Sequence, residues 1–215
     1  MRHDTHTHTL YSDGIGSVLE NIQEAERKGL SLVAITDHSH YVLNGNFESY
    51  VREIERWKGE AETVVLAGLE GNAVDGGVDV PEWAAKKLDF VIASVHEWVE
   101  RPERYLELVR EALMDEKVDV IGHFGASFPY AGFPSMEELE EILELAEENG
   151  KAFEISSAYR VPELEFIREC VKRGIKLTFA SDAHRPSRVG DISWSEKVFR
   201  KAGGRKEDLL FEEFL

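Results

Sequence analysis

The sequence predicts an α/β fold in which βα units close into a barrel, and three observations lead to this prediction. Short runs of Val, Ile, Leu and Phe alternate with longer segments of helical periodicity, as in a parallel sheet covered by helices. Seven such runs fit within 215 residues. Most of them lack polar alternation, which is typical of strands buried on both faces. No linker-like stretch divides the chain, so residues 1–215 are expected to form a single domain.

The predicted strands are the short apolar runs themselves. They cover residues 3–6, 32–36, 63–69, 90–94, 118–122, 152–155 and 176–180. In barrels of this kind the carboxyl ends of the strands share one face, and the chemistry takes place there.

Two of the helices between the strands begin with a capping-box pattern. Ser17 and Glu20 are spaced so that the hydroxyl and the carboxylate accept hydrogen bonds from free N–H groups at a helix start. Gly29 marks the end of this helix. The same pattern recurs from Ser135, and Gly150 marks the stop of the second helix.

Two further helices are predicted from apolar residues at helical spacing in residues 103–115 and 162–173. Segment 71–82 is irregular and contains Asp75-Gly76-Gly77. It is expected to be a loop near the functional site.

The composition limits the classes of partner. The formal net charge is −17 and the pI is near 4.9, so the surface repels phosphate backbones and extended nucleic acid is not an expected partner. A small phosphorylated substrate is compatible with this negative charge if metal cations make the inside of a cleft positive.

The only cysteine is Cys170, so no disulfide forms within the chain. No apolar run reaches the ~18 residues of a membrane span, and the first residues lack a signal-peptide pattern. We therefore expect a cytoplasmic protein that does not bind membranes. The oligomeric state stays open.

Histidines gather at the strand ends. His6 ends the first predicted strand and His8 comes two residues later. Residues i and i+2 of a strand point the same way, so both rings can reach one metal ion. All eight histidines lie at predicted strand ends or beside them. The further candidate ligands at these ends are His38, Glu70, His96, His123, Asp182 and His184.

Mixed imidazole and carboxylate ligands favour Zn²⁺, Mn²⁺ or Fe²⁺ over Ca²⁺ and Mg²⁺, which prefer oxygen ligands. One zinc ion needs about four ligands, so a set of this size indicates more than one metal. No Gly-rich phosphate loop points to another cofactor.

These residues carry a resemblance to a known family. From residue 3 to about residue 190, the chain is similar to the PHP (polymerase and histidinol phosphatase) superfamily of metal-dependent phosphoesterases. The resemblance implies a distorted seven-stranded (β/α)7, TIM-like barrel with two or three divalent metal ions. The motifs that carry it are His6-Thr7-His8, Thr36-Asp37-His38, Glu70, Ser94-Val95-His96, Gly122-His123 and Ser181-Asp182-Ala183-His184.

The resemblance also implies a ligand set for each metal. The implied ligands are His6, His8, Glu70 and Asp182 for the first metal, Glu70, His96 and His123 for the second, and His38 and His184 for the third. Many family members supply another histidine to the third metal, where this chain has Asp13 as the candidate replacement. His3 and His40 match no ligand position, and His40 is expected to be at most a pocket residue.

Residues that touch the substrate are predicted less directly. The segment from Glu154 to Arg160 is similar to one that brings an arginine toward the substrate phosphate in histidinol-phosphatase-type members. An arginine fits phosphate bidentately, although a surface ion pair of Arg160 is the alternative. Arg185 and Arg188 are further phosphate candidates. Aromatic residues that either line a pocket or pack the fold are Trp98, Phe124, Phe128, Tyr130 and Phe133.

Three functions fit these observations. The first is a metal-dependent phosphatase of a small phosphomonoester such as L-histidinol phosphate, with Glu70, Asp182, His184 and Arg160 as the catalytic residues. The second is a phosphodiesterase or exonuclease that acts on nucleotides or short oligonucleotides. The third is a non-catalytic PHP-like barrel that serves as a subunit, in which the ligand set typically decays.

Overall fold

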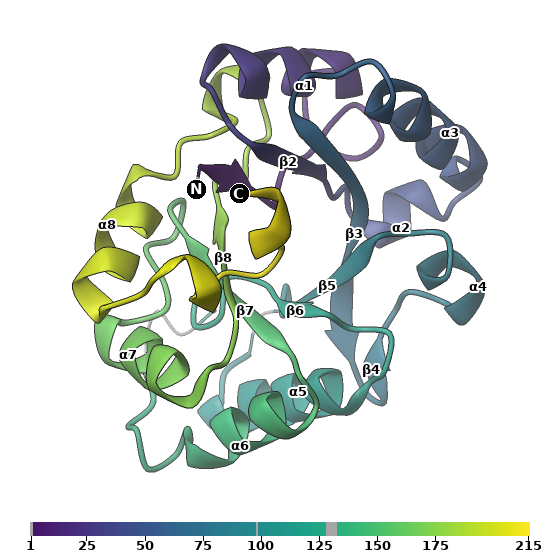
Figure 1. The fold of residues 1–215 in the computed structure, drawn as a ribbon. Coiled ribbons are helices and arrows are strands. Elements are labelled where there is room, and N and C mark those ends of the chain that lie inside the picture. Colours follow the sequence, from purple (N-terminus) through teal and green to yellow (C-terminus); the bar gives the residue numbers. More distant parts are fainter. Residues whose placement is uncertain (1, 98, 128–132) are drawn as a thin grey trace.

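Seven parallel strands form a nearly closed ring with helices around its outside (Figure 1). The structure is a computed structural model that describes residues 2–97, 99–127 and 133–215. The strands follow the order β1-β2-β3-β5-β6-β7-β8, which confirms the predicted (β/α)7 barrel. Their bounds are β1 (His3–Asp4), β2 (Leu32–Ile35), β3 (Val64–Val74), β5 (Phe90–Ser94), β6 (Val120–Ile121), β7 (Ala152–Ser156) and β8 (Leu177–Ala180).

The helices pack against the outer wall of this ring. They are α1 (Val18–Arg27), α2 (Ser39–Val42), α3 (Phe47–Lys58), α4 (Glu82–Ala85), α5 (Pro102–Met114), α6 (Glu140–Glu148), α7 (Leu164–Arg173) and α8 (Ser193–Ala202). Three 3-10 turns follow β8, namely η1 (Pro186–Arg188), η2 (Lys206–Asp208) and η3 (Glu212–Phe214). Within the described ranges, no helix has the length and apolar character needed to cross a membrane.

The predicted capping boxes both form. Ser17 Oγ accepts a hydrogen bond from the Glu20 N–H at 3.2 Å, and the Glu20 carboxylate accepts one from the Ser17 N–H at 2.8 Å. Gly29 follows α1 with φ +67°, a backbone conformation that favours glycine. The corresponding bonds at Ser135 close a turn that precedes α6.

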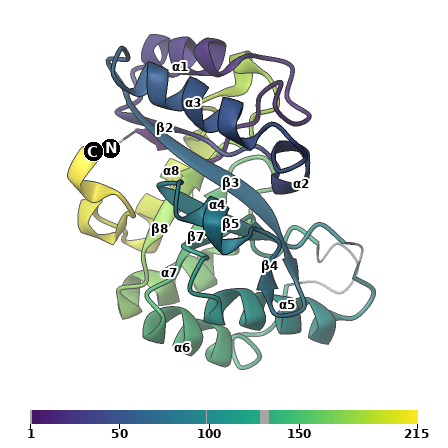
Figure 2. The same ribbon diagram turned by 90° about the vertical axis from the view of Figure 1, so that its right-hand side faces the viewer.

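Segment 71–82 is not the loop that the sequence suggested. Strand β3 continues to Val74, and β4 (Gly77–Val78) returns antiparallel beside it. Figure 2 shows this hairpin at the far end of the long β3 ribbon. Gly76 and Gly77 have φ +86° and +126°, so the two glycines that looked irregular supply the tight turn. Asn72 in this segment lies 2.8 Å from His96, one of the candidate ligands, so the segment lies beside the candidate site.

The ring closes between its first and last strands. The Thr5 N–H donates to the Phe179 carbonyl at 3.0 Å, and Thr7 pairs with Ala183 in parallel. Buried Asp4 reinforces this seam, because its carboxylate accepts hydrogen bonds from the N–H groups of Ser181 at 2.9 Å and Gly190 at 2.7 Å. The Ser181 hydroxyl also donates to it at 2.5 Å.

Replacing Asp4 by alanine is expected to lower the free energy of unfolding by about 2 to 4 kcal/mol, since four buried donors, including the His6 N–H at 3.4 Å, lose their acceptor. Urea denaturation measures the change. The matched control is Asp75→Ala, because the Asp75 side chain is 78% exposed at the hairpin tip. Equal stability of the two variants would show that Asp4 does not hold the seam.

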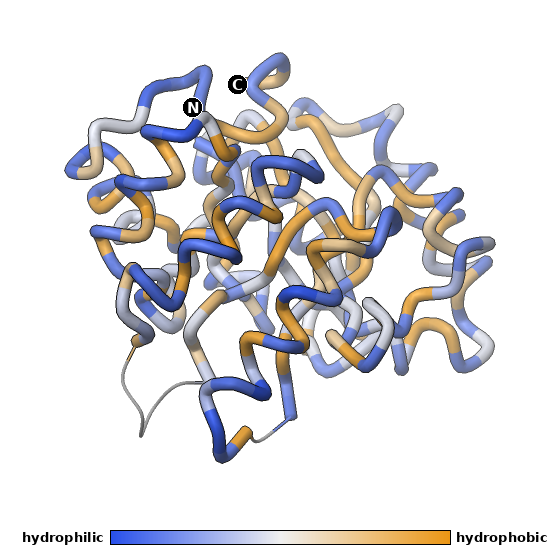
Figure 3. Tube along the Cα trace, turned by 90° about the horizontal axis from the view of Figure 1, so that it is seen from below, coloured by the Kyte–Doolittle hydropathy of each residue, from blue (hydrophilic) through white to orange (hydrophobic). Residues whose placement is uncertain are grey.

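The C-terminal segment covers the amino end of the barrel. Leu210, Phe211 and Leu215 pack against an inner apolar cluster that includes Leu32 and Ile92. In Figure 1 this segment lies across the ring, and Figure 3 shows hydrophobic stretches running through the centre of the molecule. Because the amino end of the barrel is covered and apolar, a site built from polar side chains is expected at the carboxyl end.

Candidate metal centre

The nine candidate metal ligands converge at the carboxyl ends of the strands. Each lies within 4.0 Å of at least one other member of the set. They are His6, His8 and Asp13 between β1 and α1, His38 after β2, Glu70 in β3, His96 after β5, His123 after β6, and Asp182 and His184 after β8. The barrel therefore collects side chains that are as far as 178 residues apart in sequence, from His6 to His184.

The first predicted set lies in the buried part of the centre. His6 Nε2 lies 3.3 Å from Glu70 Oε2 and 3.7 Å from Asp182 Oδ1. His8 Nε2 lies 3.1 Å from Asp182 Oδ1 and 3.6 Å from Glu70 Oε2. Two donors that share a tetrahedral metal at about 2.1 Å lie about 3.4 Å apart. His6, His8 and Glu70 therefore have the spacing of ligands around one ion, and Asp182 lies beside both of these histidines.

The second predicted set shares Glu70. Its other oxygen, Oε1, lies 3.0 Å from His96 Nε2 and 3.1 Å from His123 Nε2. Oε1 thus faces His96 and His123, whereas Oε2 faces His6, His8 and, at 2.8 Å, His38. This is the arrangement needed for a carboxylate that bridges two ions.

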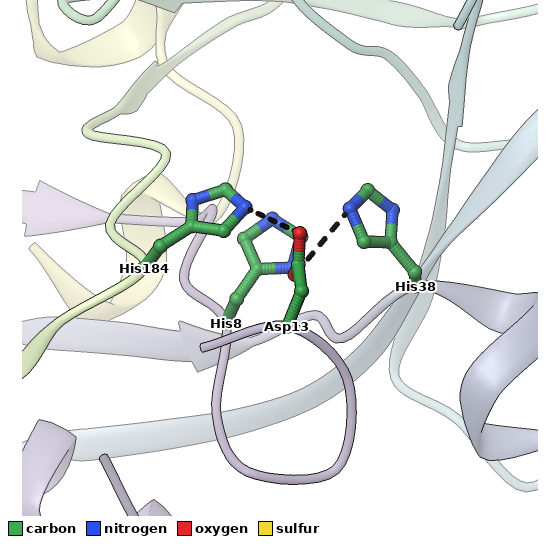
Figure 4. A group of neighbouring side chains, drawn as sticks. All are labelled: His8, Asp13, His38 and His184. Atoms are coloured by element: carbon green, nitrogen blue, oxygen red, sulfur yellow. Dashed lines mark ion pairs between the residues drawn. The ribbon is translucent and has the colours of Figure 1, made fainter. Parts of the chain in front are cut away.

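The third predicted set includes the candidate that replaces the missing histidine. Asp13 lies between the rings of His38 and His184 (Figure 4). Its oxygens are 3.6 Å from His38 Nε2 and 3.3 Å from His184 Nε2. His8 joins the same group through Nδ1, 3.8 Å from Asp13 Oδ1.

The chemistry of the donors fits bound cations. His6 Nε2 is buried and makes no hydrogen bond of normal geometry with any described residue. Burial lowers the pKa of His6, but the carboxylates of Glu154, Glu70 and Asp182 outweigh it and raise the pKa well above its ordinary value. Burial raises the pKa of Glu70, yet the histidines around it hold that pKa well below its usual range. Buried carboxylates that face an unpaired ring nitrogen match a metal site.

Glu154 is a member of the site that the sequence argument did not select. This buried carboxylate in β7 lies 2.8 Å from His6 Nδ1 through Oε1, and its Oε2 accepts the backbone N–H of His123 at 2.9 Å. A carboxylate on the far nitrogen of a ligand histidine fixes the ring and its tautomer. A lone Glu inside the apolar run Ala152-Phe153-Glu154-Ile155 is the signal in the sequence that points to it.

Glu154→Gln is expected to weaken binding of the first metal by about 10- to 100-fold, because the neutral amide orients and polarises His6 less strongly. Competition with a chromogenic chelator measures the affinity. Glu144→Gln on the exposed face of α6 is the control. Unchanged affinity in Glu154→Gln would remove this residue from the centre.

Asp37 explains how Asp13 reaches the centre. The buried Asp37 carboxylate accepts hydrogen bonds from the Thr9 N–H at 2.7 Å, the Thr9 hydroxyl at 2.8 Å and the Ser12 hydroxyl at 2.6 Å. These bonds hold the loop between β1 and α1, which carries Asp13 at its exposed side. The motif Thr36-Asp37-His38 therefore supplies a loop anchor beside a candidate ligand.

The three candidate arginines are exposed. Arg160 follows β7 with φ +58°, and Arg185 follows His184. Arg188 is paired with Asp191, with Nε 2.9 Å from Oδ2. In the described parts of the chain, none of the three is within ion-pair distance of the nine candidate ligands.

Tyr159, next to Arg160, does reach the centre. Its ring centroid lies 5.1 Å from that of His123, and its hydroxyl hydrogen-bonds to Asp182. Burial, followed by the negative charge of Asp182, raises the pKa of Tyr159 to about 12. The sequence argument did not select this residue.

The other singled-out side chains serve the fold or lie outside the described residues. His3 is buried, stacks on Phe179 and accepts the Phe179 N–H at 3.0 Å, so it is structural. His40 is exposed on α2, with its ring 5.5 Å from that of His38. Phe124 is buried and packs against Phe133. Trp98, Phe128 and Tyr130 lie outside the described residues.

Several known proteins are similar in sequence to this chain over nearly its whole length. A probable phosphatase of Thermoanaerobacter sp. (strain X514) is 33% identical over 229 residues, which cover 96% of this chain and 88% of the relative. A probable phosphatase of Clostridium botulinum (strain Hall) is 29% identical, with 98% and 90% covered. The DNA polymerase/3′-5′ exonuclease PolX of Bacillus subtilis (strain 168) is 28% identical over 98% of this chain but 39% of its own length.

Among solved structures, the histidinol phosphate phosphatase of Lactococcus lactis, complexed with Zn, L-histidinol and phosphate, has the same fold. The TM-score is 0.67 at 20% identity, and 95% of this chain and 94% of that one are covered. The model of the PHP domain matches residues 4–158, which contain seven of the nine candidate ligands. The chain belongs to the PHP domain family.

Proposed function

We propose that this metal-dependent phosphoester hydrolase of the PHP family acts on a small phosphomonoester such as L-histidinol phosphate. The observation that carries the proposal is Glu70, whose two oxygens face two different groups of histidines at the open end of the barrel. The relatives named probable phosphatases support the reaction. The histidinol phosphate phosphatase of the same fold supports the substrate class.

The residues present fit two or three divalent ions of zinc, manganese or iron. His6, His8, Glu70 and Asp182 would hold one ion, and His96 and His123 would share a second with Glu70. Asp13, His38 and His184 would hold a third. When bound, such ions lower the pKa of a shared water and neutralise charge on the phosphate oxygens.

The exposed side chains of the site would handle the substrate. Arg160 would bind a phosphate oxygen through its guanidinium fork, and Arg185 lies after the next strand on the same face. Among the six candidate ligand histidines, His184 has the most exposed side chain, at 38%. We assign it to the side of the site where the alcohol leaves. Residues 1–215 would act together as one domain.

Arg160→Ala is expected to lower kcat/KM about 10- to 100-fold, mainly through KM, because one charge-assisted phosphate contact is lost. Steady-state kinetics measure it. Arg168→Ala on α7 is the control, since Arg168 pairs with Glu165 on the surface. An unchanged KM would leave Arg160 with a surface role only.

Phosphodiester hydrolysis is the second candidate, because the exonuclease PolX matches 98% of this chain. The net charge of −17 limits it to nucleotides and short oligonucleotides. A non-catalytic barrel is not supported, since all nine candidate ligands lie together. A panel of phosphomonoesters assayed beside a dinucleotide separates the two enzymatic functions. Hydrolysis of the dinucleotide alone would overturn the phosphatase proposal.

A further inference from the structure

We propose that Asn72 and Asp79, in the β3–β4 hairpin, form a hydrogen-bond relay that holds His96 in the tautomer able to bind metal. The inference rests on the proposed function, since it takes His96 as a ligand of the second ion. It gives the hairpin segment 71–82 a role that the ligand set alone leaves unexplained.

The relay begins at the Asp79 carboxylate. Its Oδ1 accepts the Asn72 backbone N–H at 2.9 Å, and its Oδ2 accepts the Asn72 side-chain amide at 2.6 Å. An ionised carboxylate donates no hydrogen bond. The NH₂ end of Asn72 must therefore face Asp79, and its carbonyl end must face the other way.

The other end of the relay is His96. Asn72 Oδ1 lies 2.8 Å from His96 Nδ1. A carbonyl oxygen only accepts, so Nδ1 carries the hydrogen and donates it. The lone pair of Nε2 is then free to bind an ion on the side of Glu70, whose Oε1 lies 3.0 Å away.

Packing alone fixes this ring less well than those deeper in the centre. The His96 side chain is 30% exposed, whereas that of His123 is 6% exposed. His96 also stands beyond the end of β5 in a segment without regular structure. A hydrogen bond on the far nitrogen is the usual means of orienting such a ligand.

The hairpin itself is held in place around Asp79. The Ser39 hydroxyl at the start of α2 donates to Asp79 Oδ1 at 2.7 Å, and the Asp79 N–H donates to the Asn72 carbonyl at 3.1 Å. A Cβ on Gly71 would lie 2.4 Å from Val78 and 3.0 Å from Asp79 Oδ1. Glycine at this position lets the two arms of the hairpin close.

The sharpest test is Asp79→Asn, which keeps the shape and removes the charge. In this variant the side-chain oxygen of residue 79 still accepts the Asn72 backbone N–H and the Ser39 hydroxyl, so it keeps the place of Oδ1. The new NH₂ group then takes the place of Oδ2 and faces the NH₂ group of Asn72. Two donors cannot pair, so the Asn72 side chain is expected to flip. The flipped Asn72 donates to His96 Nδ1 and moves the ring hydrogen to Nε2. The second zinc is expected to bind about 10- to 100-fold more weakly, and the His96 Nδ1–H resonance of the zinc-loaded protein is expected to disappear.

The double variant Asn72→Asp with Asp79→Asn rebuilds the relay with its ends exchanged. The carboxylate at position 72 accepts from both the amide at position 79 and His96 Nδ1. Zinc affinity and the Nδ1–H resonance are expected to return toward the original values. Asn72→Asp alone places two carboxylates next to each other, so it is not expected to rebuild the relay.

Asp75→Asn, at the tip of the same hairpin, is the control, and thermal unfolding of every variant checks the fold. If the second metal site binds zinc equally tightly in Asp79→Asn and in the unaltered protein, the relay is overturned and the proposed function is unaffected. A double variant no better than Asp79→Asn would also overturn it. An unaltered protein that takes up no zinc would overturn the proposed function and, with it, the role assigned to His96.

Discussion

Replacement of Glu70 by glutamine is expected to abolish tight binding of the first two metals and to lower phosphatase activity at least about 10³-fold. Glu70 is 1% exposed, and each of its oxygens faces histidines of a different group. Glutamine has nearly the same shape but carries no negative charge. The two ions would lose the one anion that they share, and their mutual repulsion would then be poorly compensated.

Metal content measured on the purified variant, followed by kinetics of phosphate release, tests this expectation. Glu60→Gln, on the exposed surface after α3, controls for the loss of one negative charge. A Glu70→Gln protein with its full metal content and full activity would contradict the bridging role and the proposed function together.

The second large effect is expected at Asp13. Asp13→Ala should remove one metal equivalent and lower kcat/KM about 10²-fold, since His38 and His184 then lose the carboxylate between them. The other two sets do not contain Asp13, so their metals should stay bound. Elemental analysis and steady-state kinetics on the same sample measure both effects.

Asp13→His provides the matched variant, because it replaces the carboxylate oxygen by a ring nitrogen that can also bind a metal ion. It is expected to keep the third equivalent and most of the activity. Loss of metal in both variants to the same extent would point to loop disruption. Retention of metal in Asp13→Ala would show that Asp13 is not a ligand.

The fold was predictable where a strand is specified by its own apolar run. The run at 90–94 became β5 without change, and β2 and β8 differ from their predicted bounds by one residue. The exception was segment 71–82. Its strand pairing depends on the turn at Gly76 and on the contact of Gly71 with Val78, and neither appears as an apolar pattern.

Eight of the nine candidate ligands could be selected from the sequence because each is a histidine or carboxylate at a predicted strand end, whereas Asp13 was selected through the family resemblance. The residues that orient them were not, since their roles exist only across the fold. Glu154 contacts His6 over 148 residues of sequence, and Asn72 contacts His96 over 24. Tyr159 likewise reaches Asp182 from the next strand. Arg160 stays a prediction, because a phosphate contact shows itself only with substrate present.

The most direct test of the account combines metal and activity in one sample. The purified protein, loaded with Zn²⁺ or Mn²⁺, is analysed for metal per chain and then assayed for phosphate release from a panel of small phosphomonoesters. The account predicts two or three divalent ions per chain and hydrolysis that is lost when a chelator removes them. A protein that stays metal-free after loading, or that binds the ions and hydrolyses no phosphate ester, would contradict it.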